Sequence, residues 1–345
     1  MATSPDVLII GGGVIGLTTA FYLRHDMNRR VTLLERGPLA RESSWAGAGI
    51  IPPAARTTAK TPMTRLLRLS VELLPKLSAD LRGITGIDNE FRVCGGIELV
   101  SGIPDATVEL WRAEGIEFRR LNADELRRLE PHLAAGIEDG YFLPEMAQVR
   151  NPRHLAALVS ACRRLGVELV EYSPVTEWVH RDNRVESVRA GQMVWSAERF
   201  LITAGAWTDE LIAPLGCGLQ IRPIRGQIVL IRPTKPLLRR IISHGLDYLV
   251  PRLDGRILIG STEEDVGFHK GNTTEAVERL RRFAYRLVPD LEGADIEMTW
   301  SGLRPEARRG HPHLGRMPGF ENLYVAAGHF RSGLMLSAAT GWLMA

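Results

Sequence analysis

The residues with the clearest chemical signature are three glycines near the N-terminus, Gly11, Gly13 and Gly16. A short apolar run over residues 7–10 precedes them and is typical of a buried parallel strand, while residues 17–24 have the pattern of a helix. Gly11 permits the tight turn between the two, Gly13 lets the backbone approach a pyrophosphate, and Gly16 lets helix and strand pack closely. The first turn of the helix then offers free N–H groups and a partial positive charge to phosphates.

An acidic residue completes this pattern. A second apolar run, residues 31–34, ends directly before Glu35, which lies nineteen residues after Gly16. A carboxylate at this position can accept hydrogen bonds from both ribose hydroxyls, and it repels the 2′-phosphate of NADP. Strand, glycine turn, helix and acid together predict a dinucleotide-binding β-α-β unit rather than an ordinary glycine-rich turn.

A stretch of small residues follows over residues 46–49. Small side chains let the backbone come close to a flat ring, and Ser43 and Ser44 just before them can donate hydrogen bonds to phosphate. Trp45 and Ile50 flank the stretch with large apolar side chains, which argues against a flexible surface loop. We therefore expect this loop to lie along a bound ligand.

No metal site is expected. His311 and His313 flank a proline, and this turn context favours a loop over a metal-binding pair. The three cysteines, Cys94, Cys162 and Cys217, lie far apart and form no Cys-x-x-Cys pair, so neither a metal centre nor a disulfide is predicted. Free thiols are typical of a reducing compartment, and this predicts a cytoplasmic protein.

Composition and charge exclude several classes of partner. Of the 345 residues, 45% are apolar and 24% are charged, and the formal net charge of +3 is spread without basic or acidic blocks. The basic cluster at 279–282 is expected on a solvated helix face, so nucleic acid is not an expected partner. No apolar stretch reaches about 18 residues, and the N-terminal segment has no basic n-region, so neither a membrane span nor a signal peptide is predicted.

The pattern of predicted elements changes along the chain. Helices are predicted over 66–81, 151–165 and 274–287, and a further helix is opened by a capping-type start at Asn122 to Glu125 and ends just before Pro131. Strands are predicted over 91–100 (with Gly95-Gly96 as a kink or bulge), 167–170, 200–207, 227–232, 246–250, 256–261, 296–300 and 323–328, and a hairpin is predicted from residues 185–188 and 193–195. A last helix is expected from about Gly333 and is still in progress at Ala345, so we expect further helical turns or a tail beyond that residue.

These elements predict an α/β chain (α+β overall) with two domains. The nucleotide-binding domain is expected to be discontinuous, over residues 1–85, 146–215 and 297–345. The strands between them have the spacing of an antiparallel sheet, and they predict an inserted substrate-binding domain over 86–145 and 216–296.

Five motifs together resemble the FAD-dependent D-amino acid oxidase family, and most closely its glycine oxidases of thiamine biosynthesis. The motifs are residues 11–16 with Glu35, the loop 43–50, Thr203-Ala-Gly-Ala-Trp207, Trp300-Ser-Gly-Leu-Arg-Pro305 and Gly328-His-Phe-Arg-Ser-Gly333. The likeness extends over essentially the whole chain, and the last two motifs together are far more specific than the glycine triplet. It implies a Rossmann-type FAD-binding domain with the inserted antiparallel domain as its substrate domain.

The resemblance also implies roles for individual residues. Those implied at FAD are Gly11, Gly13, Val14, Ile15, Gly16, Glu35, Arg36, Ser43, Ser44, Ala48, Gly49, Ile50, Val175 and Gly205, with His329, Phe330, Arg331, Ser332, Gly333, Leu334 and Met335 along the isoalloxazine. Those implied at the substrate, as catalytic residues, are Tyr248, Arg304 and Arg331. Some family members attach FAD through a cysteine near the C-terminal flavin motif. No cysteine follows Cys217, so non-covalent FAD is expected.

Flavin-dependent amine oxidation requires a substrate whose carboxylate is fixed and whose amine is neutral. A planar guanidinium is the best carboxylate clamp, and the resemblance places Arg304 in that role. Tyr248 matches the family's active-site tyrosine, although a core tyrosine fits the sequence alone nearly as well. Arg331 is expected at the flavin edge, where it holds negative charge on the reduced ring or contacts substrate. The amine can lose its proton before binding, so no acid or base is required and Asp247 is not assigned as one.

The expected reaction is the oxidation of glycine or a similarly small amino acid by oxygen to the imine, and then to the 2-oxo acid, ammonia and hydrogen peroxide, feeding thiamine thiazole synthesis. Three alternatives stay open: a D-amino acid dehydrogenase, a sarcosine or other N-methyl amine oxidase, and a non-catalytic flavoprotein. A tRNA-modifying oxidoreductase would need a basic patch or an extra domain, and neither is evident. One methyl group discriminates by only about 1–3 kcal/mol, so glycine and sarcosine are not separated. A homo-oligomer is compatible with the resemblance, because tetramers occur in the family.

Overall fold

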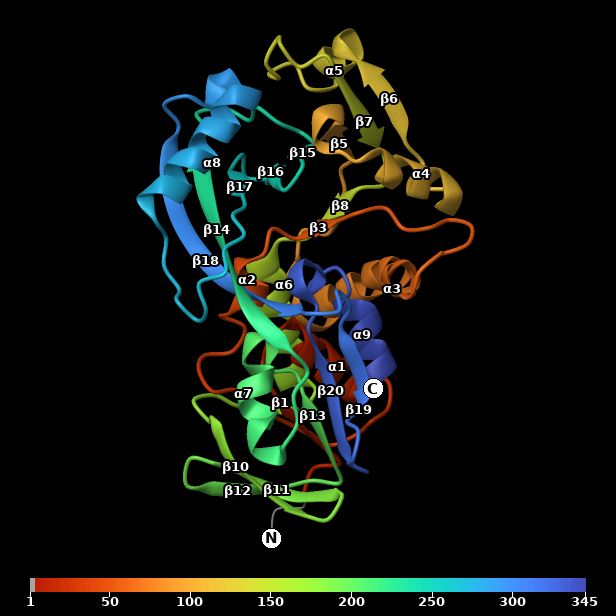
Figure 1. The fold of residues 1–345 in the computed structure, drawn as a ribbon, viewed down its shortest axis with the longest axis vertical. Helices are drawn as coiled ribbons and strands as arrows, with labels where there is room; N and C mark the ends of the chain where they lie inside the picture. The colour runs from red at the N-terminus through yellow and green to blue at the C-terminus, as the bar shows by residue number, and fades with distance from the viewer. Residues whose placement is uncertain (1–3) are drawn as a thin grey trace.

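The structure is a computed structural model that describes residues 4–345 of the chain. Two large sheets lie along the long axis of the molecule, a six-stranded sheet in the lower half of Figure 1 and an eight-stranded sheet in the upper half. No helix within residues 4–345 is both long enough and apolar enough to cross a bilayer.

The six-stranded sheet has the order β19-β20-β13-β1-β2-β9. Its strands are β1 (Val7–Ile10), β2 (Val31–Leu34), β9 (Glu168–Val170), β13 (Arg199–Ile202), β19 (His313–Arg316) and β20 (Leu323–Ala327). Neighbouring strands are parallel except for the antiparallel pair β19 and β20. The central strands β1 and β2 are buried throughout and apolar except for Thr32, because elements cover both faces of the sheet.

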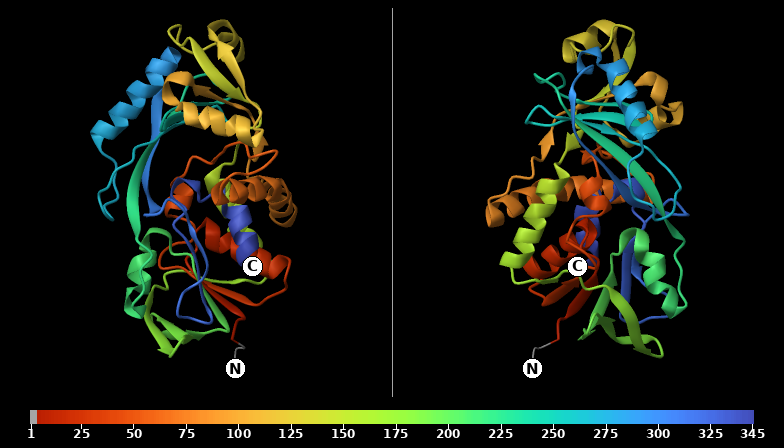
Figure 2. Two further views of the ribbon diagram at one scale, coloured as in Figure 1. Left: turned by 45° about the vertical axis from the view of Figure 1, so that its right-hand side comes forward. Right: turned by 90° about the vertical axis from the view of Figure 1, so that its left-hand side faces the viewer.

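Side-chain alternation along the strands divides the core of this sheet into two faces. Ile9 and Leu33 face one side, where Leu17 belongs to the same apolar cluster, whereas Leu8 and Phe200 belong to the cluster on the other side. The first face is covered by α1 (Val14–His25), α3 (Pro62–Thr85), α6 (Asn151–Arg164) and α9 (Ser337–Met344), and the second by α7 (Thr208–Ile212) and the antiparallel strands β10 (Val175–Arg181), β11 (Arg184–Ala190) and β12 (Met193–Ser196). Figure 2 shows α6 and α7 on opposite sides of the sheet.

The eight-stranded sheet has the order β18-β14-β17-β16-β15-β5-β7-β6. Its strands are β5 (Gly96–Leu99), β6 (Arg119–Asn122), β7 (Asp139–Leu143), β14 (Ile221–Arg232), β15 (Ile241–His244), β16 (Asp247–Pro251), β17 (Ile257–Gly260) and β18 (Asp295–Ala307). One face packs on α8 (Thr274–Leu287), whose Leu280 and Phe283 share an apolar cluster with Val229. The other face carries Ile228 in a cluster with Ala48, so this face is turned toward the small-residue loop.

The remaining elements are short. They include α2 (Ser43–Ala46), α4 (Asp105–Glu114), α5 (Ala123–Leu129), a small sheet of β3 (Ile50–Ile51), β8 (Ala147–Gln148) and β4 (Arg92–Val93), and 3₁₀ turns at Val100–Gly102, Gly205–Trp207, Ala213–Leu215, Pro289–Leu291 and Phe330–Ser332. The long strands β14 and β18 pair from Ile221 with Ala307 to Arg232 with Asp295. In Figure 1 they extend from the upper sheet down to the six-stranded sheet, so both strands run through the junction between the two sheets.

The predicted fold class is confirmed, since the chain combines a parallel Rossmann-type sheet with an antiparallel sheet. Several local predictions are also confirmed. The helix predicted over 274–287 has these bounds, and Asn122 and Glu125 form the capping box that opens α5. The predicted hairpin is formed by β11 and β12. Strongly periodic segments and capping signals are local properties, which is why they are readable without tertiary information.

Three predicted elements were wrong in part. Residues 91–100 are not one strand: Gly95, with φ +71°, turns the chain, and β4 and β5 belong to different sheets. The strand predicted over 200–207 ends at Ile202, and a 3₁₀ turn occupies its last residues. The C-terminal helix begins at Ser337 rather than near Gly333, because a separate 3₁₀ turn follows Gly328. Strand β10 was not predicted, since most of its residues are exposed and no apolar alternation marks it.

The division into two domains stays a prediction. Strand β18 begins at Asp295, so the predicted boundary at residue 297 falls inside a strand of the eight-stranded sheet. Residues 297–307, predicted as part of the nucleotide-binding domain, are therefore hydrogen-bonded to β14.

Candidate active site

A cavity of about 590 Å³ lies at the junction of the two large sheets. Residues at the carboxyl ends of β1, β2, β13 and β20 border it, and β14, β16 and β18 contribute further lining residues. In open α/β sheets, ligands bind outside the carboxyl ends of the parallel strands, where the strand order changes direction. Here that point is β1, which has β2 on one side and β13 on the other. The cavity therefore has the position of a nucleotide site.

The structure brings nearly all predicted site residues to this one cavity. Those predicted at the cofactor that line it are Gly11, Gly13, Val14, Ile15, Glu35, Arg36, Ser43, Ser44, Ala48, Gly49, Ile50, Val175, Gly205, His329, Phe330, Arg331, Ser332, Gly333, Leu334 and Met335. The predicted catalytic residues Tyr248, Arg304 and Arg331 line it too. Gly16 lies outside the lining, and a Cβ on it would collide with the carbonyl oxygen of Gly11. Gly16 thus serves the contact between helix and strand.

The glycine turn and Glu35 form a cradle for a nucleotide. Gly11 has φ +117°, which favours glycine, and the first turn of α1 contains no acidic side chain. The Glu35 carboxylate accepts the backbone N–H of Gly12 at 2.7 Å and that of Gly37 at 3.1 Å. These bonds fix the carboxylate at the end of β2 while its remaining lone pairs stay available for hydroxyl groups. An anion at the helix terminus and a ribose at Glu35 both fit these residues.

The small-residue loop is held in place from several sides. The Ser44 hydroxyl accepts the Val14 backbone N–H at 3.0 Å, and the Asn151 amide donates to the Ser44 carbonyl at 2.7 Å. The Trp300 indole N–H donates to the carbonyl oxygen of Ala46 at 3.0 Å. Strand β18 therefore contacts the loop directly, and the two motifs that looked separate in the sequence form one wall.

Arg252 is a structural residue of this wall that sequence reasoning missed. Its buried guanidinium donates to the Ala48 carbonyl at 2.8 Å, to the Val149 carbonyl at 3.3 Å and to the Gln148 side chain at 2.9 Å. Burial lowers the pKa of Arg252 to about 10, so the guanidinium stays charged near neutral pH. No local signal marks it, because its partner Ala48 is 204 positions away in the sequence.

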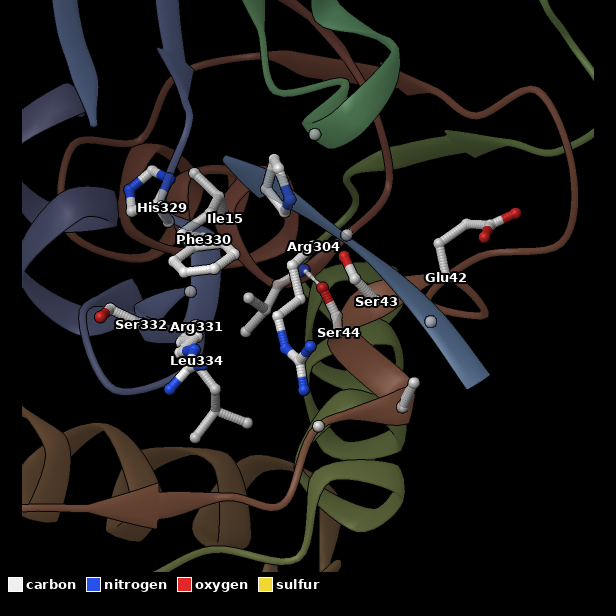
Figure 3. A pocket seen from close by; sticks show the side chains of 18 of the residues that line it. Ile15, Glu42, Ser43, Ser44, Arg304, His329, Phe330, Arg331, Ser332 and Leu334 are labelled. Atoms are coloured by element: carbon white, nitrogen blue, oxygen red, sulfur yellow. Dashed lines mark hydrogen bonds between the residues drawn. The ribbon is translucent and has the colours of Figure 1, made fainter. Parts of the chain in front are cut away.

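Arg304 occupies the cavity wall on β18 (Figure 3). Its guanidinium donates to the Thr262 carbonyl at 2.9 Å and to the Ser261 hydroxyl at 2.8 Å. Burial lowers the pKa of Arg304, with Tyr248 acting in the opposite direction. Within residues 4–345 no aspartate or glutamate forms an ion pair with it. Arg304 is thus a largely buried cation with neutral protein partners, and burying a cation without an anion is unfavourable.

Two glycines make room for the polar side chains of this wall. A Cβ on Gly226 would collide with the guanidinium of Arg304, and a Cβ on Gly260 would collide with the ring of Tyr248. Strands β14 and β17, which carry these glycines, are neighbours in the sheet. Sequence reasoning missed both glycines, because their role depends on which strands pair.

Arg331 differs from Arg304 in its charge partner. It forms an ion pair with Glu263, and its guanidinium lies 5.4 Å from the centre of the Phe330 ring. Burial lowers the pKa of Arg331 as well. Figure 3 shows Arg304 and Arg331 projecting into the same space, from β18 and from the turn after β20. Of the two cations, Arg331 is the one that forms an ion pair with a carboxylate within residues 4–345.

His329 and Asp247, two further titratable residues considered from the sequence, each interact with another side chain of the protein. His329 is buried, its Nε2 lies 3.1 Å from the Thr340 hydroxyl, and burial lowers its pKa to about 4, so the ring is neutral at pH 7. It connects the cavity wall to α9. Asp247 pairs with Arg279 at 2.8 Å, and this ion pair engages its carboxylate outside the cavity lining.

A nucleotide cradle at the carboxyl edge of a parallel sheet, facing a buried cation on an antiparallel sheet, defines a nucleotide-dependent enzyme. The model of the DAO family, described as FAD dependent oxidoreductase, matches residues 6–345. The chain belongs to this family, and FAD is its cofactor.

Individual relatives agree with this assignment. The chain is 36% identical to a protein named glycine oxidase from Pseudomonas putida, over 98% of this chain and 92% of that protein. It superposes on the crystal structure of glycine oxidase from Geobacillus kaustophilus with a TM-score of 0.91 and 33% identity, over 99% and 93% of the two chains. It is also 33% identical to the bifunctional protein ThiO/ThiG of Synechocystis, over all of this chain and 51% of that protein. The protein is a flavin-dependent amino acid oxidase.

Proposed function

We propose that this oxidase acts on glycine or a similarly small amino acid. The observation that carries the proposal is Arg304, a buried guanidinium without an acidic partner in the described residues, in the same cavity as the FAD cradle. A desolvated guanidinium favours a planar carboxylate, because two parallel N–H···O bonds satisfy both groups. An amino acid supplies such a carboxylate beside the amine that is oxidised.

The two side chains proposed to bind the substrate carboxylate come from different strands, Tyr248 from β16 and Arg304 from β18. Two N–H groups of Arg304 are directed at Ser261 and Thr262, which fix the plane of the guanidinium and leave other N–H groups for the substrate. The Tyr248 hydroxyl lies beside this guanidinium and supplies a second donor. Holding the carboxylate at two points orients Cα relative to the loop 46–49 and the turn 330–332.

When bound, FAD would supply the acceptor for the hydride from Cα, and oxygen would take up the electrons to give hydrogen peroxide. The chain's own residues bind the substrate carboxylate, orient Cα–H and exclude water from the cavity. The amine loses its proton before it binds, so no protein base is assigned. Water converts the released imine to the 2-oxo acid and ammonia, which for glycine gives glyoxylate.

We also propose that the product enters thiamine thiazole synthesis. The sequence resemblance to the glycine oxidases of thiamine biosynthesis supports this placement, as does the likeness to a bifunctional protein in which a second unit accompanies a segment like this chain. Growth of a thiamine auxotroph lacking its own oxidase of this kind, complemented by the chain, would support the proposal. Rescue by an Arg304→Ala variant would contradict it.

The test of the reaction is a peroxide assay with the FAD-loaded protein over glycine, sarcosine and D- and L-amino acids. We expect peroxide with glycine and with small substrates of the same shape. Flavin reduction without peroxide, restored by an artificial acceptor, would identify a dehydrogenase instead. A strong preference for sarcosine would favour an N-methyl amine oxidase, and the absence of flavin reduction by every substrate would favour a non-catalytic flavoprotein.

A further inference from the structure

Glu98 is an acidic side chain of the cavity to which neither the sequence motifs nor the proposed reaction gives a role. It belongs to β5, where Ile97 and Leu99 pack in the apolar cluster beneath α8. Because side chains alternate along a strand, Glu98 is on the opposite face, which is the face turned toward the cavity.

Strand register places Glu98 in line with the predicted substrate site. Glu98 pairs with Ser243 between β5 and β15, Ser243 pairs with Tyr248 between β15 and β16, and Tyr248 pairs with Gly260 on β17. Residues directly opposite one another share a face of the sheet. Glu98 is therefore two strands from Tyr248, or about 10 Å at the usual spacing of strands.

The carboxylate of Glu98 has little compensation from the protein. The Ser243 hydroxyl is its hydrogen-bond partner, and burial raises the pKa of Glu98 to about 7 with that bond acting in the opposite direction. The titratable groups around it are the phenols of Tyr141, opposite on β7, and of Tyr248, while Arg304 and Arg331 line the same cavity. None of these, within the described residues, forms an ion pair with Glu98.

The same cavity is also lined by Pro52, Met146, Gly245 and Leu246, none of which has an ionisable side chain. A largely desolvated carboxylate interacts strongly with any charge that comes near it, because the local dielectric constant is low. It favours a positive or hydrogen-donating group and disfavours a second carboxylate.

We propose that Glu98 determines substrate specificity: its carboxylate accepts a hydrogen bond from a cationic or donor group that the amino acid carries on its amine or side chain, and it excludes a substituent bearing a second carboxylate. This inference rests on the proposed function, since it takes the α-carboxylate to be held at Arg304 and Tyr248. The substrate class is then small amino acids with a neutral or cationic substituent.

The test compares matched substrates in the FAD-loaded wild type, Glu98→Gln and Glu98→Leu. The pairs are N-(2-aminoethyl)glycine against iminodiacetate, and D-2,3-diaminopropionate against D-aspartate, with glycine as the reference. Glu109→Gln, which removes an exposed carboxylate on α4, is the matched control. We expect each Glu98 variant to lower the cationic-to-anionic ratio of kcat/KM by at least about tenfold, since like charges brought together in a desolvated site are strongly unfavourable. Dividing each kcat/KM by that for glycine in the same variant removes any effect of Glu98 on the common amino acid part, and the control should behave as wild type.

The pH dependence provides a second readout. The wild-type discrimination against iminodiacetate relative to glycine should rise between about pH 6 and about pH 8, across the raised pKa of Glu98, as the carboxyl group ionises, because neither compound changes its own charge in this range. In Glu98→Gln this rise should vanish. A ratio that is equal in wild type and both variants, with the same pH profile, would overturn the inference while leaving glycine oxidation intact.

A binding measurement separates this inference from the proposed function. Each compound is titrated anaerobically into the FAD-loaded protein, and for every compound that leaves the flavin oxidised the perturbation of the flavin absorption gives its Kd. If no compound reduces the flavin, the proposed function fails. The inference then stands or falls on whether Glu98→Gln lowers the preference for cationic ligands.

Discussion

The guanidinium of Arg304 lies in the space that a side chain on Gly226 would fill. Gly226 on β14 pairs with Gly302 on β18, two residues before Arg304, so the arginine folds back across the neighbouring strand. Its contacts with Ser261 and Thr262 hold it there. The position of the proposed substrate clamp therefore depends on the absence of a side chain at Gly226.

Gly226→Ala should displace the Arg304 guanidinium while leaving the FAD cradle intact. We expect KM for glycine to rise by about tenfold or more, since a hydrogen bond to a charged group is worth about 1.5–3 kcal/mol, and we expect the affinity for FAD to stay near wild type. Steady-state kinetics and an FAD titration measure the two effects. A variant with normal KM would show that the guanidinium does not hold the substrate from this position.

Arg304→Lys should bind substrate weakly, because the charge is kept and the planar fork is lost. Arg304→Ala should lose more, since the buried carboxylate would have no partner. Both variants should keep the wild-type flavin spectrum. Anaerobic flavin reduction by glycine is the measurement, with Arg309→Ala, an exposed arginine of the next turn, as the control. Equal reduction rates in wild type and Arg304→Ala would indicate that Arg331, rather than Arg304, binds the substrate carboxylate.

Glu35→Ala should weaken FAD binding more than it changes turnover of the loaded enzyme. The carboxylate borders the cavity at the end of β2 and also holds the N–H groups of Gly12 and Gly37. Each lost hydrogen bond from a charged acceptor is worth about 1.5–3 kcal/mol before relaxation. Titration of the apoprotein with FAD checks this. An unchanged dissociation constant would remove Glu35 from the cofactor site.

The purified protein should be yellow, with dissociable FAD. Cys217 is the last cysteine in the sequence, and it is absent from the cavity lining. Acid precipitation should release the flavin into the supernatant. Colour retained in the pellet would instead indicate a covalent link through another side chain.

Stability should fall on mild acidification because two histidines are buried and neutral. Burial lowers the pKa of His154 and of His329 to about 4, below the unfolded value near 6.5. Between these values the unfolded chain binds protons that the native chain does not, so stability is lost as pH falls from about 6.5. Each histidine should contribute a slope of roughly 1.4 kcal/mol per pH unit over this window. Glu98, whose folded pKa of about 7 lies above its unfolded value, contributes a slope of opposite sign in the same window, so the comparison between variants is decisive. Urea unfolding between about pH 5 and about pH 7 should give His329→Gln a slope lower than that of wild type by roughly 1.4 kcal/mol per pH unit. The same slope in that variant would contradict a neutral buried ring.

The cofactor cradle could be predicted from the sequence because its parts are contiguous. The strand before Gly11, the turn, helix α1 and Glu35 all lie within the first 35 residues, and local steric and hydrogen-bonding rules determine each of them. Helix α8 and the capped start of α5 were readable for the same reason. In these segments the residues that make the contact are close in sequence, so periodicity and capping report it directly.

The arrangement of side chains around the proposed substrate site could be seen only in the tertiary structure. Arg304 contacts the backbone of Thr262, 42 residues away, and Arg252 reaches Ala48 across 204 residues. Glu98 reaches the cavity because β5 pairs with β15, a neighbour far along the chain. No local pattern specifies which strands become neighbours or in which register, since that choice is made by burial of the whole sheet against α8 and the small-residue loop. The sequence therefore determined the cofactor and its binding turn, whereas strand pairing decided which side chains meet above it.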